Sequence, residues 1–182
     1  MIPRLGGQTT WGWKVAAYLF LAGVGAGAYL DAQVLDWLNE GVPLTSKVGT
    51  ALSWPLVALG TIFLIWDLGM PQRFWRAGMV PARSWISRGV VIIMLFLALG
   101  FVHTLALVWP WTVLQDAEAA RTVLSALGAL FALLTLGYTG LLLGAVRPIA
   151  FWTMPALPLL FIASGMSTGA MAINLSLPLA FS

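Results

Sequence analysis

The segment DLGMPQRFWRAGMVPARSWISRG, residues 67–89, lies between two long apolar runs and decides how the chain can fold. The runs at residues 48–66 and 90–111 contain no Asp, Glu, Lys or Arg, and each is close to the roughly 20 residues that a helix needs to cross a bilayer. The segment itself contains Trp75 and Trp85, a side chain typical of the headgroup level of a membrane. The pattern therefore predicts two transmembrane helices joined by a basic loop at the membrane surface. The loop's arginines are Arg73, Arg76, Arg83 and Arg88.

The composition of the whole chain supports the same interpretation. Apolar residues make up 60% of the chain and charged residues only 8%, whereas soluble domains carry roughly 25% charged residues. We therefore expect an all-α integral membrane protein. Its 182 residues have room for a four-helix transmembrane bundle plus about one further transmembrane helix, within a single transmembrane domain covering residues 1–182. The helices are expected at about 13–38, 48–67, 86–110, 122–146 and 157–178.

Several classes of site and function are excluded by residue content. The protein has no cysteine and only one histidine, His103, so we expect it to bind no iron–sulfur cluster, no zinc–thiolate site and no haem with paired histidine ligands. No Ser-His-Asp arrangement, phosphate-binding glycine loop or carboxylate pair is present, so no catalytic residue or metal ligand is assigned. The basic residues adjoin membrane spans, which favours contact with membrane lipid and not with nucleic acid.

Loop charges predict an orientation. The two basic residues Lys47 and Arg121 fall on one side of the membrane, and the other seven fall on the side that holds the N-terminus and the 67–88 loop. Since cytoplasmic loops are enriched in Lys and Arg, the N-terminus is expected in the cytoplasm. The seven are Arg4, Lys14, Arg73, Arg76, Arg83, Arg88 and Arg147.

Two ionisable side chains have both a structural and a functional interpretation. His103 lies about 22 Å along its helix from Arg88, and it either hydrogen-bonds between helices or relays protons, as ionisable groups inside membranes often do. Asp67 ends the second helix. It either pairs with Arg73 or Arg76, or exchanges protons with a reduced ligand.

Small and polar residues near the basic side leave similar alternatives. Lys14 lies at the mouth of the first helix and can snorkel to headgroups. Tyr18 lies one turn deeper, and Tyr138 lies about 13 Å from the basic side. A buried tyrosine hydroxyl needs a hydrogen-bond partner, which a helix carbonyl or a ligand would supply. The small residues that begin at Gly23 permit close helix packing and also leave room for a flat ligand.

Several stretches, in order along the chain, resemble the NrfD / polysulfide reductase membrane-subunit family. The resemblance implies a quinone-binding (menaquinone or ubiquinone) membrane anchor subunit of a multisubunit oxidoreductase in the prokaryotic cytoplasmic (inner) membrane. Such a subunit exchanges electrons with a docked ferredoxin-like iron–sulfur subunit that serves a molybdopterin-type catalytic subunit. The stretches are WGWKVAAYLFLAGVGAGA (11–28), DLGMPQRFW (67–75), PARSWISRG (81–89), GYTGLLLG (137–144), RPIAFW (147–152) and FIASGMSTGA (161–170).

The resemblance also implies roles for individual residues. The Tyr138 position approaches a quinone carbonyl, the Tyr18 position lines the same pocket, and Asp67 and Arg73 lie near its mouth. We add Lys14 to this site from its position alone. A flat ring would approach the first helix at Gly23. Proton relay falls to Asp67 and His103, and partner docking to the basic loop through Arg73, Arg76, Arg83 and Arg88.

Two other functions fit the same sequence. A non-redox structural or assembly subunit would use the GxxxG-like spacings at Gly140–Gly144 and Gly165–Gly169 for helix packing. A small transporter would use the proline-broken start of the last span, which contains Pro155 and Pro158. Members of the resembled family usually have eight or more helices, whereas five are expected here, so a proton-pumping role is not assigned.

Overall fold

The computed structural model describes residues 12–38, 43–67, 85–109, 118–145 and 154–180. They form α1 (Trp13–Trp37), α2 (Pro43–Asp67), α4 (Trp85–Val108), α5 (Glu118–Ala145) and α6 (Leu157–Ala180). Each of the five helices is long and apolar enough to cross a membrane. Within the described ranges there is no strand, which confirms the expected all-α membrane fold.

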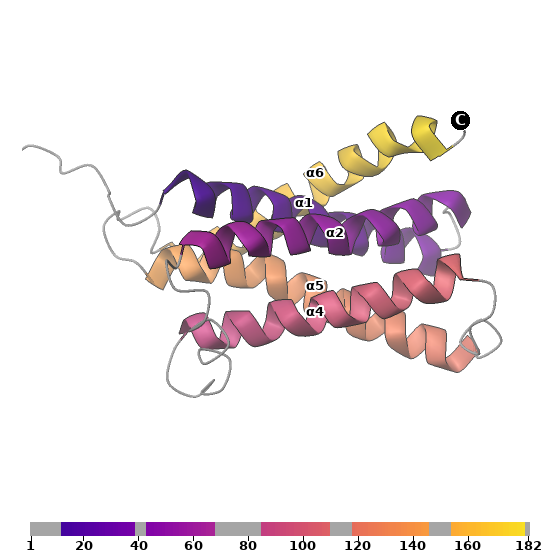
Figure 1. Ribbon diagram of the computed structural model, residues 1–182, viewed down its shortest axis with the longest axis horizontal. Helices are drawn as coiled ribbons and strands as arrows, with labels where there is room; N and C mark the ends of the chain where they lie inside the picture. Colours follow the sequence, from indigo (N-terminus) through magenta and orange to yellow (C-terminus); the bar gives the residue numbers. More distant parts are fainter. Residues whose placement is uncertain (1–11, 39–42, 68–84, 110–117, 146–153, 181–182) are drawn as a thin grey trace, which may run out of the picture.

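The helices α1, α2, α4 and α5 run side by side, and α6 packs on α1, α5 and α2 (Figure 1). Helix α1 is enclosed by the others: 67% of its most apolar stretch is buried, against 17% for α6. In Figure 1 the C-terminal half of α6 diverges from the other helices. The side chains of α1 therefore decide what lies at the centre of the bundle.

Two helices begin earlier than the apolar runs indicated. Helix α2 begins at Pro43 instead of near residue 48, because the fixed φ of proline suits the first position of a helix and its missing N–H costs nothing there. Helix α5 begins at Glu118 instead of near residue 122, where an acidic side chain favours the positive end of the helix dipole. Pro55 lies inside α2 without ending it, as membrane bundles tolerate.

The small residues of α1 allow backbone-to-backbone packing on two sides. A Cβ atom on Gly25 would lie 2.7 Å from the Ser53 carbonyl oxygen of α2, and one on Gly27 would overlap the Gly165 carbonyl of α6. From the other helix, a Cβ atom on Gly169 would overlap the backbone of α1 at Gly27. The helix-packing interpretation of this glycine-rich stretch is confirmed, as is that of the Gly165–Gly169 spacing.

Hydrogen bonds join α1, α2 and α4 in the half of the bundle away from the start of α1. The Tyr29 hydroxyl lies 2.7 Å from Nδ1 of His103. The Gln33 Nε2 group donates to Oγ1 of Thr50 over 3.1 Å, and the hydroxyl of Thr104 donates to the Thr50 carbonyl over 3.2 Å. The interpretation of His103 as a histidine hydrogen-bonded between helices is therefore confirmed, and a role in proton relay stays a prediction.

The close approach of α1 to α6 predicts a strong response to substitution at Gly27. Gly27→Val should lower the thermal unfolding temperature of the detergent-solubilised protein markedly, because overpacking a core costs about 1–3 kcal/mol and here the obstacle is backbone. Gly137→Ala is the matched control, since its new Cβ would meet only Cδ1 of Ile162 at 4.0 Å. Equal unfolding temperatures for the two variants would contradict this packing.

Candidate functional site

Four helices bring polar side chains to one end of the bundle core. Because the helices alternate in direction, the beginning of α1 lies beside the end of α2, and the beginning of α4 lies beside the end of α5 (Figure 1). Tyr18 is on the second turn of α1, Asp67 ends α2, and Tyr138 is near the end of α5. We call Tyr18 and Tyr138 the tyrosine site.

Tyr18 has a hydroxyl group without a partner. Its side chain is fully buried, and among the described residues nothing hydrogen-bonds to the buried hydroxyl oxygen. Leaving a buried polar group unpaired costs about 1–3 kcal/mol, and native proteins satisfy the great majority of such groups. The Tyr18 hydroxyl is therefore placed to bond to a group that is not part of these helices.

Tyr138 lies on the opposite wall of the same site. Its side chain is 5% exposed and packs directly on the backbone of α4 at Gly89. Its hydroxyl lies within electrostatic range of Tyr18. The tyrosine site thus presents two phenol groups, from α1 and α5, at one end of an otherwise apolar core.

A ligand with acceptor oxygens fits these two phenols. Each tyrosine hydroxyl can donate one hydrogen bond, and the unpartnered Tyr18 hydroxyl shows that the protein's described helices do not use its donor. The surrounding core side chains, among them Ile93 and Leu136, are apolar. A flat, largely apolar molecule with carbonyl oxygens matches both features. Among the described residues there is no group of His, Asp or Glu able to hold a metal ion.

Gly23 borders free space, but not on the side of Tyr18. Gly23 is buried, and no atom lies within 4 Å of the position of an added Cβ. Five residues of helix correspond to about 140° of rotation, so Gly23 and Tyr18 lie on different sides of α1. The Gly23 carbonyl faces Gly165 of α6. The structure therefore does not bring Gly23 to the tyrosine site.

Lys14 and Asp67 lie at the same end of the bundle, nearer its surface. The Lys14 ammonium is 4.8 Å from the centroid of the Trp66 ring, a cation–π contact in an aromatic cluster with Trp13 and Phe63. Lys14 therefore turns toward α2. The exposed Asp67 has a carboxylate oxygen 3.7 Å from the Cβ position of Gly12, beside the positive end of the α1 dipole.

The remaining predicted residues are elsewhere. Arg88 is exposed on the first turn of α4, whereas Arg73, Arg76 and Arg83 lie outside the described residues. His103 is not near Asp67: between residues 89 and 103 α4 rises about 21 Å, so the two proposed proton-relay residues serve opposite ends of the bundle.

Two residues of these environments were missed from the sequence. Tyr29 bonds to His103, and the available signal was its spacing of eleven residues from Tyr18, which places both tyrosines on one face of α1. Gly89, on which Tyr138 packs, carried no signal beyond being a glycine near the start of an apolar run.

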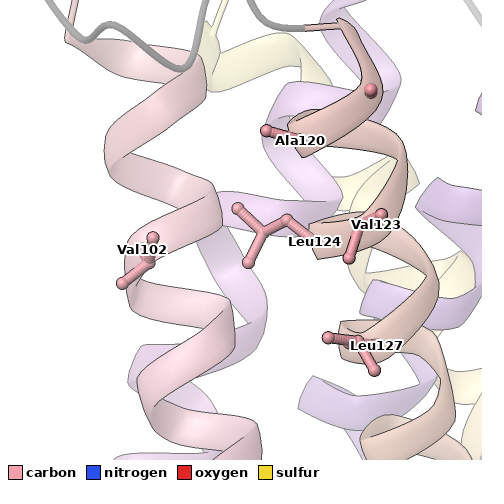
Figure 2. A pocket seen from close by; sticks show the side chains of 6 residues that line it. Val102, Ala120, Val123, Leu124 and Leu127 are labelled. Atoms are coloured by element: carbon pink, nitrogen blue, oxygen red, sulfur yellow. The ribbon is translucent and has the colours of Figure 1, made fainter.

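A separate groove lies between α4 and α5 near residues 102 and 124 (Figure 2). It has a volume of about 410 Å³, and Figure 2 shows Leu124 pointing across it toward Val102. All its lining side chains are aliphatic, so it offers no hydrogen-bond donor to a quinone ring. Along α5, Leu127 is about 16 Å from Tyr138, so this groove is distinct from the tyrosine site. The lining residues are Val102, Ala119, Ala120, Val123, Leu124 and Leu127.

Comparison with known proteins agrees with the geometry. Residues 2–182 match the family described as "Polysulphide reductase, NrfD". The sequence is 33% identical over 175 residues to a membrane-family relative from the polysulfide reductase of Wolinella succinogenes, an alignment covering 87% of this chain and 55% of the relative. It is 34% identical over 181 residues to protein NrfD of Escherichia coli K12, covering 88% of this chain and 57% of the relative.

A more distant relative is a subunit of the sulfite dehydrogenase of Allochromatium vinosum, 28% identical over 163 residues, with 83% of this chain and 50% of the relative covered. The chain thus spans about half the length of the curated relatives it matches. No solved structure matches the chain. With a family match over nearly all of its length and five helices able to span a membrane, the chain belongs to the NrfD family of polysulphide reductase membrane proteins.

Proposed function

We propose that the chain is a quinone-binding membrane anchor subunit of a multisubunit oxidoreductase. The observation that carries the proposal is the fully buried Tyr18 hydroxyl, which has no partner among the described residues and lies close to Tyr138. The names of two relatives support it, since one belongs to a polysulfide reductase and the other to a sulfite dehydrogenase.

The tyrosine site would hold a quinone through its carbonyl oxygens. A bound quinone supplies the chemistry of accepting or releasing electrons together with protons. Tyr18 and Tyr138 would donate hydrogen bonds to it and fix the plane of the ring, and the apolar residues around them exclude water. The exposed carboxylate of Asp67 lies at the same end of the bundle, where it can pass protons between water and the site. Lys14 and Gly23 stay proposed ligand contacts, and a bound quinone would have to draw Lys14 away from Trp66.

The partners follow from the charge of the same end. We propose that the arginines at positions 73, 76, 83 and 88 form a docking surface for an iron–sulfur subunit, which passes electrons to a molybdopterin-type catalytic subunit. Arg88 is exposed one residue before Gly89, the backbone seat of Tyr138. Docking there would bring a cluster near the quinone. We place this end in the cytoplasm of a prokaryotic cell, with the chain in its inner membrane.

His103 would act at the other end of the bundle. The 2.7 Å contact between the Tyr29 hydroxyl and Nδ1 of His103 allows a proton to move between them. Fully buried Ile93 and Phe96 lie along α4 between Gly89 and this pair. We propose that His103 exchanges protons with the far face and that Asp67 serves the quinone side.

A structural or assembly role is the second candidate. It is favoured by the close packing of Gly27 on Gly165, which would stabilise a membrane anchor whether or not it binds a quinone. The two functions differ in what happens to the Tyr18 hydroxyl, since only a quinone-binding subunit has a use for an unpaired donor at that depth.

Removing either phenol hydroxyl of the tyrosine site should weaken quinone binding. Tyr18→Phe and Tyr138→Phe should each lower kcat/KM for quinol oxidation by the purified complex by about tenfold, the effect of losing one hydrogen bond of about 1.4 kcal/mol. Tyr29→Phe is the control, since its hydroxyl bonds to His103 at the other end. If no quinone copurifies with the complex and all three variants oxidise quinol at the normal rate, the structural role is correct.

The orientation can be measured directly because the protein has no cysteine. A single cysteine introduced by Ser84→Cys should react with a membrane-impermeant maleimide in inverted vesicles and not in intact spheroplasts. Glu118→Cys, at the start of α5 on the other side, should show the reverse. Labelling of Ser84→Cys in spheroplasts alone would place the basic loop outside the cytoplasm.

A further inference from the structure

We propose that Gly89 is a positioning residue for the Tyr138 hydroxyl, so that the first turns of α4 set the geometry of the quinone site. This inference rests on the proposed function. A Cβ atom on Gly89 would overlap the Cζ, Cε1 and hydroxyl oxygen atoms of Tyr138. The phenol therefore rests directly on the backbone of α4, and it is the hydroxyl end of the ring that makes the contact.

The absence of a side chain at Gly89 has a spatial cause and not a conformational one. Gly89 is buried inside α4, away from either end of the helix, and its φ is not in the left-handed region. Glycine inside a helix costs about 1 kcal/mol relative to alanine. The backbone would accept alanine at this position, and only the tyrosine ring prevents it.

The contact fixes where the donor lies relative to Tyr18. Tyr18 is held by burial on α1, whereas the position of the Tyr138 hydroxyl depends on how far the ring can approach α4. A methyl group at residue 89 would push the hydroxyl away from α4. Hydrogen bonds weaken steeply as donor distance and angle depart from their optimum, so a ligand bonded by both phenols would lose one of its contacts.

A second glycine provides a matched control at the other end of the bundle. A Cβ atom on Gly128 of α5 would overlap the hydroxyl oxygen of Tyr29, and the Tyr29 hydroxyl bonds to His103. Gly89→Ala and Gly128→Ala therefore introduce the same methyl group against a tyrosine hydroxyl in a helix interior. They should destabilise the protein similarly, and only Gly89→Ala should act on the quinone.

The test measures the affinity of the purified protein for a short-tailed ubiquinone analogue and a short-tailed menaquinone analogue, by quenching of tryptophan fluorescence. Gly89→Ala should raise the Kd of the bound analogue about tenfold, with Gly128→Ala unchanged. In the Tyr138→Ala background, where the ring is absent, adding Gly89→Ala should produce no further change in Kd. This double variant also gives a folded readout if Gly89→Ala alone does not fold.

The outcomes separate this inference from the function on which it rests. If wild-type protein binds neither analogue, the proposed function fails. If wild type binds and Tyr138→Phe weakens binding, the function stands. In that case an unchanged Kd for Gly89→Ala, an equal increase for Gly128→Ala, or a further increase on adding Gly89→Ala to Tyr138→Ala would each overturn the positioning role of Gly89.

Discussion

Backbone-to-backbone contact along α1 is the constraint on which the rest of the bundle depends. With Gly25 against the Ser53 carbonyl of α2 and Gly27 against Gly165 of α6, α1 cannot rotate or withdraw without a clash or a cavity. Its rotation directs Tyr18 and Tyr29, which share one face, into the core. The same packing that stabilises the fold therefore places both phenols.

The two tyrosines of α1 have contrasting environments. Tyr29 is satisfied by His103 and packs edge-on against Phe96. Tyr18, equally buried, has no partner among the described residues. Since both lie on the same helix face, general membrane burial cannot account for the difference. An unpaired donor beside a second phenol is the feature expected of a ligand site, whereas the Tyr29–His103 pair is complete without a ligand.

Much of this arrangement could be predicted from the sequence, for physical reasons that also limit it. Charge-free runs of about 20 residues predict spans because the bilayer fixes their length, and closely spaced small residues predict close helix approach. Helix rotation is decided by packing against neighbours, so Gly23 was expected beside Tyr18 but faces α6. Lys14 has a long side chain that reaches Trp66 instead. The seat of Tyr138 on Gly89 depends on two helices far apart in the sequence, and no local pattern predicts it.

Photoaffinity labelling tests the central claim most directly. An azido-quinone irradiated with the purified complex should label α1 around Tyr18 and α5 around Tyr138, and excess unlabelled quinone should abolish that labelling. Label confined to the aliphatic groove around Val102 and Leu124, or label insensitive to competition, would show that the tyrosine site does not bind the quinone ring.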